Sequence, residues 1–230
     1  MLSSRLSKHR YPPLMGLALG LILLLLSSCQ VPGSPAPNVK DTPPPGVFSI
    51  EPFDLFQGND AKFKALVDGY AAGVRIRSTA SGKLLLAEVE LWEDGENKGV
   101  QSVFNFQLSP PDTPPKTGEF LYTIQQLSLE KESAWKIKAT YAVPSSSGSS
   151  SSSTTLPPTA ESTIHIWSPI NQPLTARESE GAYIFALVGD TDISFDPLQS
   201  AQKAPWAYLL KLSVVSSDEL PHRRPQQKKP

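Results

Sequence analysis

The chain has 230 residues, a formal net charge of −1, 23 prolines and one cysteine. A single cysteine excludes an internal disulfide, and a near-neutral charge without a broad basic face argues against a nucleic-acid partner. The length suffices for one large β domain or two small ones, and the high proline content indicates a folded domain interrupted by irregular segments.

The amino-terminal segment has the pattern of a secretory signal. Three basic residues, Arg5, Lys8 and Arg10, precede an uncharged apolar run at residues 14–26. As a helix this run would span about 20 Å, which is less than the roughly 30 Å of a bilayer's hydrocarbon core. The pattern therefore predicts a cleaved signal peptide over residues 1–28 rather than a membrane-spanning helix.

The run ends in Leu26-Ser27-Ser28-Cys29, which resembles the lipobox of bacterial lipoproteins. The resemblance implies cleavage before Cys29, a diacylglyceryl group on its thiol, and acylation of the new amino terminus by a fatty acid such as palmitate. Two or more acyl chains would anchor the protein to the bacterial cell envelope, at the outer membrane or the outer face of the cytoplasmic membrane. The alternatives are an ordinary secretory signal with an incidental cysteine and an uncleaved membrane anchor.

The segment after the cysteine, residues 30–46, holds six prolines and almost no apolar side chain. Such a segment cannot form a core and favours extended polyproline II geometry, in which it would reach roughly 50 Å. We interpret residues 29–46 as a lipidated cysteine followed by a tether. The alternative is a docking motif for a proline-binding partner.

After the tether, short β-type runs alternate with turns. Residues 84–92 and 100–108 flank the turn pair Asp94-Gly95, which predicts a hairpin. In residues 135–143 apolar and polar side chains alternate strictly, which indicates a strand with one solvent-exposed face. The expected strands are residues 74–77, 84–92, 100–108, 119–124, 135–143, 162–167, 182–188 and 205–215.

Three segments between the strands are expected to be loops. Residues 144–160 are a low-complexity run rich in serine. We expect a disordered loop inserted into a long hairpin, in which residues 135–143 pair with residues 162–167, rather than a linker between domains. Residues 171–181 and 190–204 are also expected to be loops.

Many short strands and no convincing helix predict an all-β fold, an antiparallel β-sandwich over residues 47–216. The stretch AAGVRIRSTASGKLLLAEVELWEDGENKG resembles bacterial immunoglobulin-like domains. The resemblance covers residues 47–167 and implies an immunoglobulin-like sandwich in which Tyr141 is the tyrosine of a late strand. The strands at 182–188 and 205–215 are additional to that plan.

Two arrangements of these extra carboxy-terminal strands are compatible with the sequence. In the first they extend one sheet of the sandwich, and in the second they form a separate subdomain. Beyond them, residues 217–230 are polar and rich in proline, and carry Arg223, Arg224, Lys228 and Lys229. We expect this segment to be a basic, disordered tail.

Asp190, Asp192 and Asp196 form the best candidate metal site, because carboxylates are the hard oxygen ligands that Ca²⁺ prefers. The spacing departs from that of an EF-hand loop, since Ser194 stands at the third ligand position and Phe195 where a glycine is needed. The alternative is an acidic turn in which an aspartate caps local backbone N–H groups.

Glu88 and Glu90 lie two residues apart on one predicted strand face. Paired carboxylates serve glycoside hydrolysis, but a solvated strand face with cross-strand Glu–Lys pairs explains them more simply. Lys136 and Lys138 supply such a face on another strand. We therefore expect no catalytic residue and no enzymatic activity.

His165 is the one histidine in a predicted strand, and we expect it at the surface. Without a second histidine nearby or a free thiol, a zinc site is excluded. Trp92 and Trp167 are predicted to lie on outer faces, where they contact a sugar or a protein partner or are covered by the carboxy-terminal strands. The covered arrangement is preferred, because it accounts for the apolar character of those strands.

These observations favour a non-enzymatic lipoprotein of the bacterial cell envelope. It would act as an interaction or assembly module, with the membrane and an envelope protein as partners and no cofactor. The alternative is a binding module for a small ligand, a glycan or Ca²⁺, through residues 190–196 or exposed tryptophans.

Overall fold

The computed structural model describes residues 42–67, 69–108, 117–128, 133–143, 149–157, 165–190, 194 and 196–219. The predicted signal peptide, Cys29, most of the predicted tether and most of the basic tail lie outside these residues. The described residues belong to one unit, which begins at Thr42.

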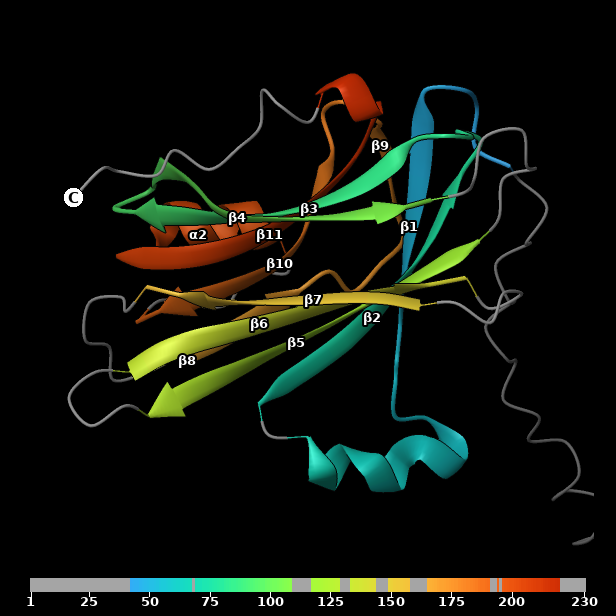
Figure 1. The fold of residues 1–230 in the computed structure, drawn as a ribbon. Coiled ribbons are helices and arrows are strands. Elements are labelled where there is room, and N and C mark those ends of the chain that lie inside the picture. The colour runs from blue at the N-terminus through green and yellow to red at the C-terminus, as the bar shows by residue number, and fades with distance from the viewer. Residues whose placement is uncertain are drawn as a thin grey trace, which may run out of the picture. The chain divides into compact units, whose positions relative to one another are not determined.

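Two antiparallel sheets pack face to face (Figure 1). The first has the order β7-β6-β5-β2-β1-β9 and the second the order β4-β3-β11-β10-β8. The strands of the first sheet are β1 (Val47–Phe53), β2 (Tyr70–Ser78), β5 (Gly118–Ser128), β6 (Ser133–Ala142), β7 (Ser149–Leu156) and β9 (Leu174–Arg177). Those of the second are β3 (Leu84–Glu93), β4 (Glu96–Gln107), β8 (His165–Pro169), β10 (Ala182–Gly189) and β11 (Trp206–Val215). The predicted all-β antiparallel sandwich is confirmed.

Alternating side chains build the core between the sheets. In β6, Trp135, Ile137 and Tyr141 are buried while Lys136 and Lys138 are exposed. This is the alternation that the sequence predicts, because successive residues of a strand point to opposite faces. The hydroxyl of Tyr141 donates to the carbonyl of Leu108, 3.5 Å away, and so links β6 to the end of β4 in the other sheet.

The predicted hairpin is β3–β4. Its two turn residues, Asp94 and Gly95, have φ angles of 51° and 78°. Positive φ at both central residues is the geometry of a type I′ turn, which matches the twist of the strands it joins. The N–H of Asp94 also donates to the carbonyl of Pro205, 3.0 Å away, so the turn is fixed to the start of β11.

The prediction for the serine-rich run is wrong over Ser149–Leu156, because these residues form β7 and pair with β6 along their whole length. Serine gives no apolar alternation, so its sequence pattern cannot reveal a strand. Most of β7 is exposed, and it ends at buried Leu156, which lies opposite Trp135. The predicted pairing of residues 162–167 with 135–143 is also wrong, since β8 lies in the other sheet beside β10.

The carboxy-terminal strands complete the second sheet rather than form a second subdomain. β11 lies between β3 and β10, with ten paired positions to β3. Its outer face packs beneath α2 (Pro197–Lys203), a helix within the segment predicted to be a loop. The loop prediction for 171–181 is wrong in part as well, because β9 lies there. A 3-10 helix, η1 (Gly58–Leu66), follows β1 and projects beyond the ends of β1 and β2 (Figure 1).

Candidate functional site

Two of the three predicted calcium ligands, Asp190 and Asp196, are among the described residues. Asp196 is the N-cap of α2, and its Oδ1 accepts from the backbone N–H groups of Leu198 at 2.9 Å and Gln199 at 3.2 Å. Asp190 follows β10 with a φ of 46°, and Asp192 lies outside the described residues. Within the described residues no group of three His, Cys, Asp or Glu side chains could hold a metal ion. The calcium site stays a prediction, although Asp196 has the capping role that was its alternative.

The predicted solvent-exposed position of Glu88 and Glu90 is wrong, since each is only 5 % exposed. Oε2 of Glu90 accepts three hydrogen bonds, which come from Trp92 Nε1 at 3.0 Å, Asn97 Nδ2 at 2.8 Å and the Tyr183 hydroxyl at 3.0 Å. Since Tyr183 is on β10, Glu90 joins strands on both sides of β11. This carboxylate is therefore held in a structural network.

The pairing of Glu88 also differs from the expectation. Glu88 lies opposite Lys211 of β11, whereas Lys136 and Lys138 are in the other sheet. The cross-strand Glu–Lys register exists, but with a lysine that the sequence did not single out. Only the pairing order of the strands identifies this partner.

The aromatic side chains of β8 face inward. The ring centroid of His165 lies 5.0 Å from that of Trp135 and 5.7 Å from that of Trp206, and Trp167 stacks on Tyr70 at 5.5 Å. The predicted surface position of His165 and outer-face position of Trp167 are therefore wrong. The predictions failed because they paired β8 with β6, while the real partner, β10, turns these rings into the space between the sheets.

Trp92 is on an outer face, as predicted, and is covered. It is half-buried against the cluster beneath α2, and its ring meets that of Tyr183 edge-on at 6.5 Å. β10 and β11 lie beside β3 in the same sheet and do not lie over Trp92, so its contacts come from the cluster beneath α2 and the ring of Tyr183.

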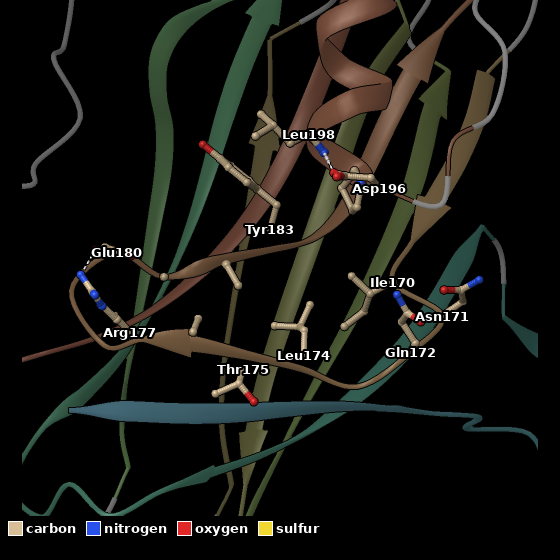
Figure 2. A pocket seen from close by; sticks show the side chains of 14 residues that line it. Ile170, Asn171, Gln172, Leu174, Thr175, Arg177, Glu180, Tyr183, Asp196 and Leu198 are labelled. Atoms are coloured by element: carbon tan, nitrogen blue, oxygen red, sulfur yellow. Dashed lines mark hydrogen bonds and ion pairs between the residues drawn. The ribbon is translucent and has the colours of Figure 1, made fainter. Parts of the chain in front are cut away.

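A pocket of about 530 Å³ lies between β9 and β10. Figure 2 shows Ile170 and Leu174 between the two strands, with Asp196 and Leu198 at the start of α2 on the far side. The volume is within the range of roughly 300–1,000 Å³ that is typical of ligand sites. Its lining residues are Ile170, Asn171, Gln172, Leu174, Thr175, Ala176, Arg177, Glu180, Gly181, Ala182, Tyr183, Asp196, Pro197 and Leu198.

The pocket exists because the chain changes sheets twice around it. β8 pairs with β10 only from Phe185 to Gly189, and the last contact is the bond from Ile170 N to Ile184 O at 3.0 Å. The chain then crosses to the first sheet as β9 and returns through a turn to β10. The first residues of β10 are thereby left without a strand on that side. Gly181 in the turn has a φ of 70°, and a side chain there would overlap the Leu212 carbonyl.

The mouth of the pocket is polar. Asn171 and Gln172 are exposed there, and Arg177 Nη1 forms an ion pair with Glu180 Oε1 at 3.1 Å. Thr175 is exposed as well, but its side chain lies on the opposite face of β9 from Leu174 (Figure 2). The lining thus combines apolar side chains such as Ile170, Leu174 and Leu198 with amide and charged groups, and is more polar than that of most small-molecule sites. Sequence reasoning missed this site, since its only local signal is the alternation of four residues in β9.

Two large apolar side chains of η1 are exposed, Phe63 by 46 % and Leu66 by 79 %. None of the residues of η1 is buried, and Lys62 Nζ lies 5.1 Å from the ring centroid of Phe63. Single exposed apolar residues are common on protein surfaces. The pocket is therefore the stronger candidate.

Among the residues described, no helix is both long and apolar enough to cross a membrane. No protein-family model, no curated protein and no solved structure matches this chain.

Proposed function

We propose that this protein is a non-enzymatic interaction module of the bacterial cell envelope, anchored by lipid at Cys29, which recognises its partner at the pocket between β9 and β10. The observation that carries the proposal is the pocket itself, a concave surface lined by both apolar and polar side chains. Such a surface on a rigid β-sandwich suits recognition.

The walls of the pocket are held in place before any partner binds. Glu178, in the turn between β9 and β10, is buried; its Oε1 accepts from Ser78 Oγ at 3.2 Å and its Oε2 from Lys83 Nζ at 2.6 Å. Its backbone N–H donates to Gly46 at 3.0 Å, and its carbonyl accepts from Val214 at 2.9 Å. Four contacts fix this turn, and a preformed site avoids the entropic cost of ordering itself on binding.

The lipid anchor has a direct test in Cys29→Ser. We expect the variant to lose fatty-acid labelling, to keep its signal peptide and to leave the lipidated membrane fraction, because serine offers no thiol for lipid transfer. Ser28→Ala is the matched control, since it keeps a small residue in the lipobox and should be processed normally. Normal labelling and processing of Cys29→Ser would contradict the anchor.

The pocket has a separate test by site-specific photocrosslinking in intact cells. A benzophenone side chain at Gln172, an exposed residue of the pocket lining, should give a discrete crosslinked product. The same group at Lys138, exposed on β6, should not. Leu198→Arg, which places a charge among the apolar side chains of the pocket lining, should remove the product at position 172. Equal products at both positions would count against the pocket.

A small ligand is the second candidate, and the volume of the pocket favours it. Native mass spectrometry of the protein released gently from its membrane would reveal a bound molecule as a discrete mass increase. The same increase in Leu198→Arg would place that molecule elsewhere.

A further inference from the structure

β9 is the edge strand of its sheet within the described residues, because the strand order ends there. Its only strand neighbour is β1, and Phe48 lies opposite Ala176. A strand at an edge presents backbone N–H and C=O groups that can pair with another chain.

The register shows which groups these are. The N–H of Glu178 donates to Gly46, so the hydrogen-bonded positions of β9 are 178, 176 and 174. Because such positions alternate along an antiparallel pair, Thr175 and Arg177 direct their backbone groups away from β1. The carbonyl of Arg177 accepts from Gly181 at 3.0 Å. Within the part of the chain that the structure describes, three groups remain for a partner, the N–H and C=O of Thr175 and the N–H of Arg177.

Pro173 agrees with this register. It precedes β9 at the next outward-facing position, where a residue without an N–H loses no bond to β1. A partner strand would therefore pair along Thr175 and Arg177 and end near Pro173.

The charged residues of the pocket lining favour a partner segment of one charge. Arg177 and Glu180 neutralise each other in their ion pair. Oδ1 of Asp196 caps α2, and its exposed carboxylate forms no ion pair with any residue that the structure describes. A basic side chain on the partner would complement it.

We propose that the ligand of this pocket is an extended peptide segment of a partner protein, which adds as a strand to the free edge of β9. One apolar side chain of the segment enters the pocket beside Ile170, Leu174 and Leu198, and a basic side chain reaches Asp196. This inference rests on the proposed function of the pocket. Main-chain pairing supplies affinity in such complexes, and the pocket supplies specificity.

The test uses the mature full-length chain in detergent and a phage-displayed library of random linear heptapeptides. We expect enriched sequences with an apolar residue and a Lys or Arg. Methylating an amide of the enriched peptide that faces β9 should weaken binding about tenfold, since it removes a backbone hydrogen bond, and methylating the next amide should not. Asp196→Asn retains the helix cap but removes the charge, and should weaken binding about two- to fivefold.

Thr175→Pro is the protein-side variant. It should abolish peptide binding with little change in thermal stability, because that N–H makes no bond to β1. Ala176→Pro is the matched control for the register and should destabilise the fold, since it removes a ladder bond. Binding that survives Thr175→Pro, or amide methylation without effect at every position, overturns strand addition.

The chain's own basic tail is another possible occupant of the β9 edge, and its deletion tests this. Deletion of residues 220–230 should leave peptide binding unchanged. Tighter binding after the deletion would identify the tail as the occupant and overturn the proposal of a partner segment. Enrichment of no heptapeptide also overturns the inference. If the benzophenone at Gln172 then still gave its crosslinked product in cells, the proposed function of the pocket would stand while strand addition failed.

Discussion

Gly118→Ala should destabilise the sandwich by about 3 kcal/mol, at the upper end of ordinary overpacking effects. Gly118 is buried in β5, and a methyl group there would overlap the ring and hydroxyl of Tyr141. That ring cannot move aside easily, because it is 4 % exposed and packs near Phe106 and Phe120 in the core. Interiors are packed too densely to absorb an added methyl group without strain.

Thermal unfolding followed by circular dichroism measures this effect, and a domain of this size should lose about 10 °C in Tm. The matched variant is Gly118→Ala with Tyr141→Leu, which removes the overlapping atoms. The methyl group should cost much less in that background than in the wild type, so the two substitutions should be strongly coupled. A Tm for Gly118→Ala within a degree of wild type would contradict the packing described here.

Raising the pH from 10 to 12 should unfold the protein steeply. Burial raises the pKa of all five tyrosines in the described residues; for Tyr70 and Tyr141 the value is about 12. The pKa of Tyr122 is also raised by burial, and the pKa values of Tyr183 and Tyr208 are raised by burial and by nearby glutamates. In the unfolded chain each tyrosine ionises near pH 10.

The direction of the change in the free energy of unfolding follows from the number of protons that each state binds. Above pH 10 the unfolded state releases tyrosine protons that the folded state keeps, so the free energy of unfolding decreases as pH rises. Below pH 10 both states are protonated, and this contribution is constant. Stability is thus lost between pH 10 and about 12.

Tm measured against pH, together with the ultraviolet absorbance of tyrosinate, checks this expectation. Ionisation should coincide with unfolding rather than precede it. Tyr141→Phe removes one contributor and a single long hydrogen bond, so its Tm should decline less steeply with pH. Tyrosine ionisation near pH 10 in a protein that is still folded would refute the burial of these side chains.

The alternation of apolar and polar residues predicts those strands that have one buried face and one solvent-exposed face. β6 and the β3–β4 hairpin satisfy this condition, and an Asp-Gly turn marks the hairpin. β9 has only four residues, too few to establish a period. α2 carries a local signal, since Asp196 and Pro197 are favoured at an N-cap and the first helical position, but the same aspartate also fits the predicted metal site, so the pattern alone does not distinguish a cap from a ligand.

The candidate site depends on strand pairing rather than on local sequence. Ile170, Leu174 and Leu198 come together only because β8 and β9 lie in different sheets. The inward rings of His165 and Trp167 have the same cause. Predicting which side chains of a strand face the core requires knowing the strand it pairs with. The residue pattern along one strand does not identify that partner.

The serine composition of β7 means that its sequence barely encodes its own alignment. Ser149–Ser153 present the same side chain at every position and are exposed. Sliding this stretch along β6 by two residues would exchange serine for serine and change no buried contact there. Leu156, opposite Trp135, is the anchor point that distinguishes one alignment from the next. The number of serines before it can therefore vary with little energetic consequence, while the contact of Leu156 with Trp135 must be kept.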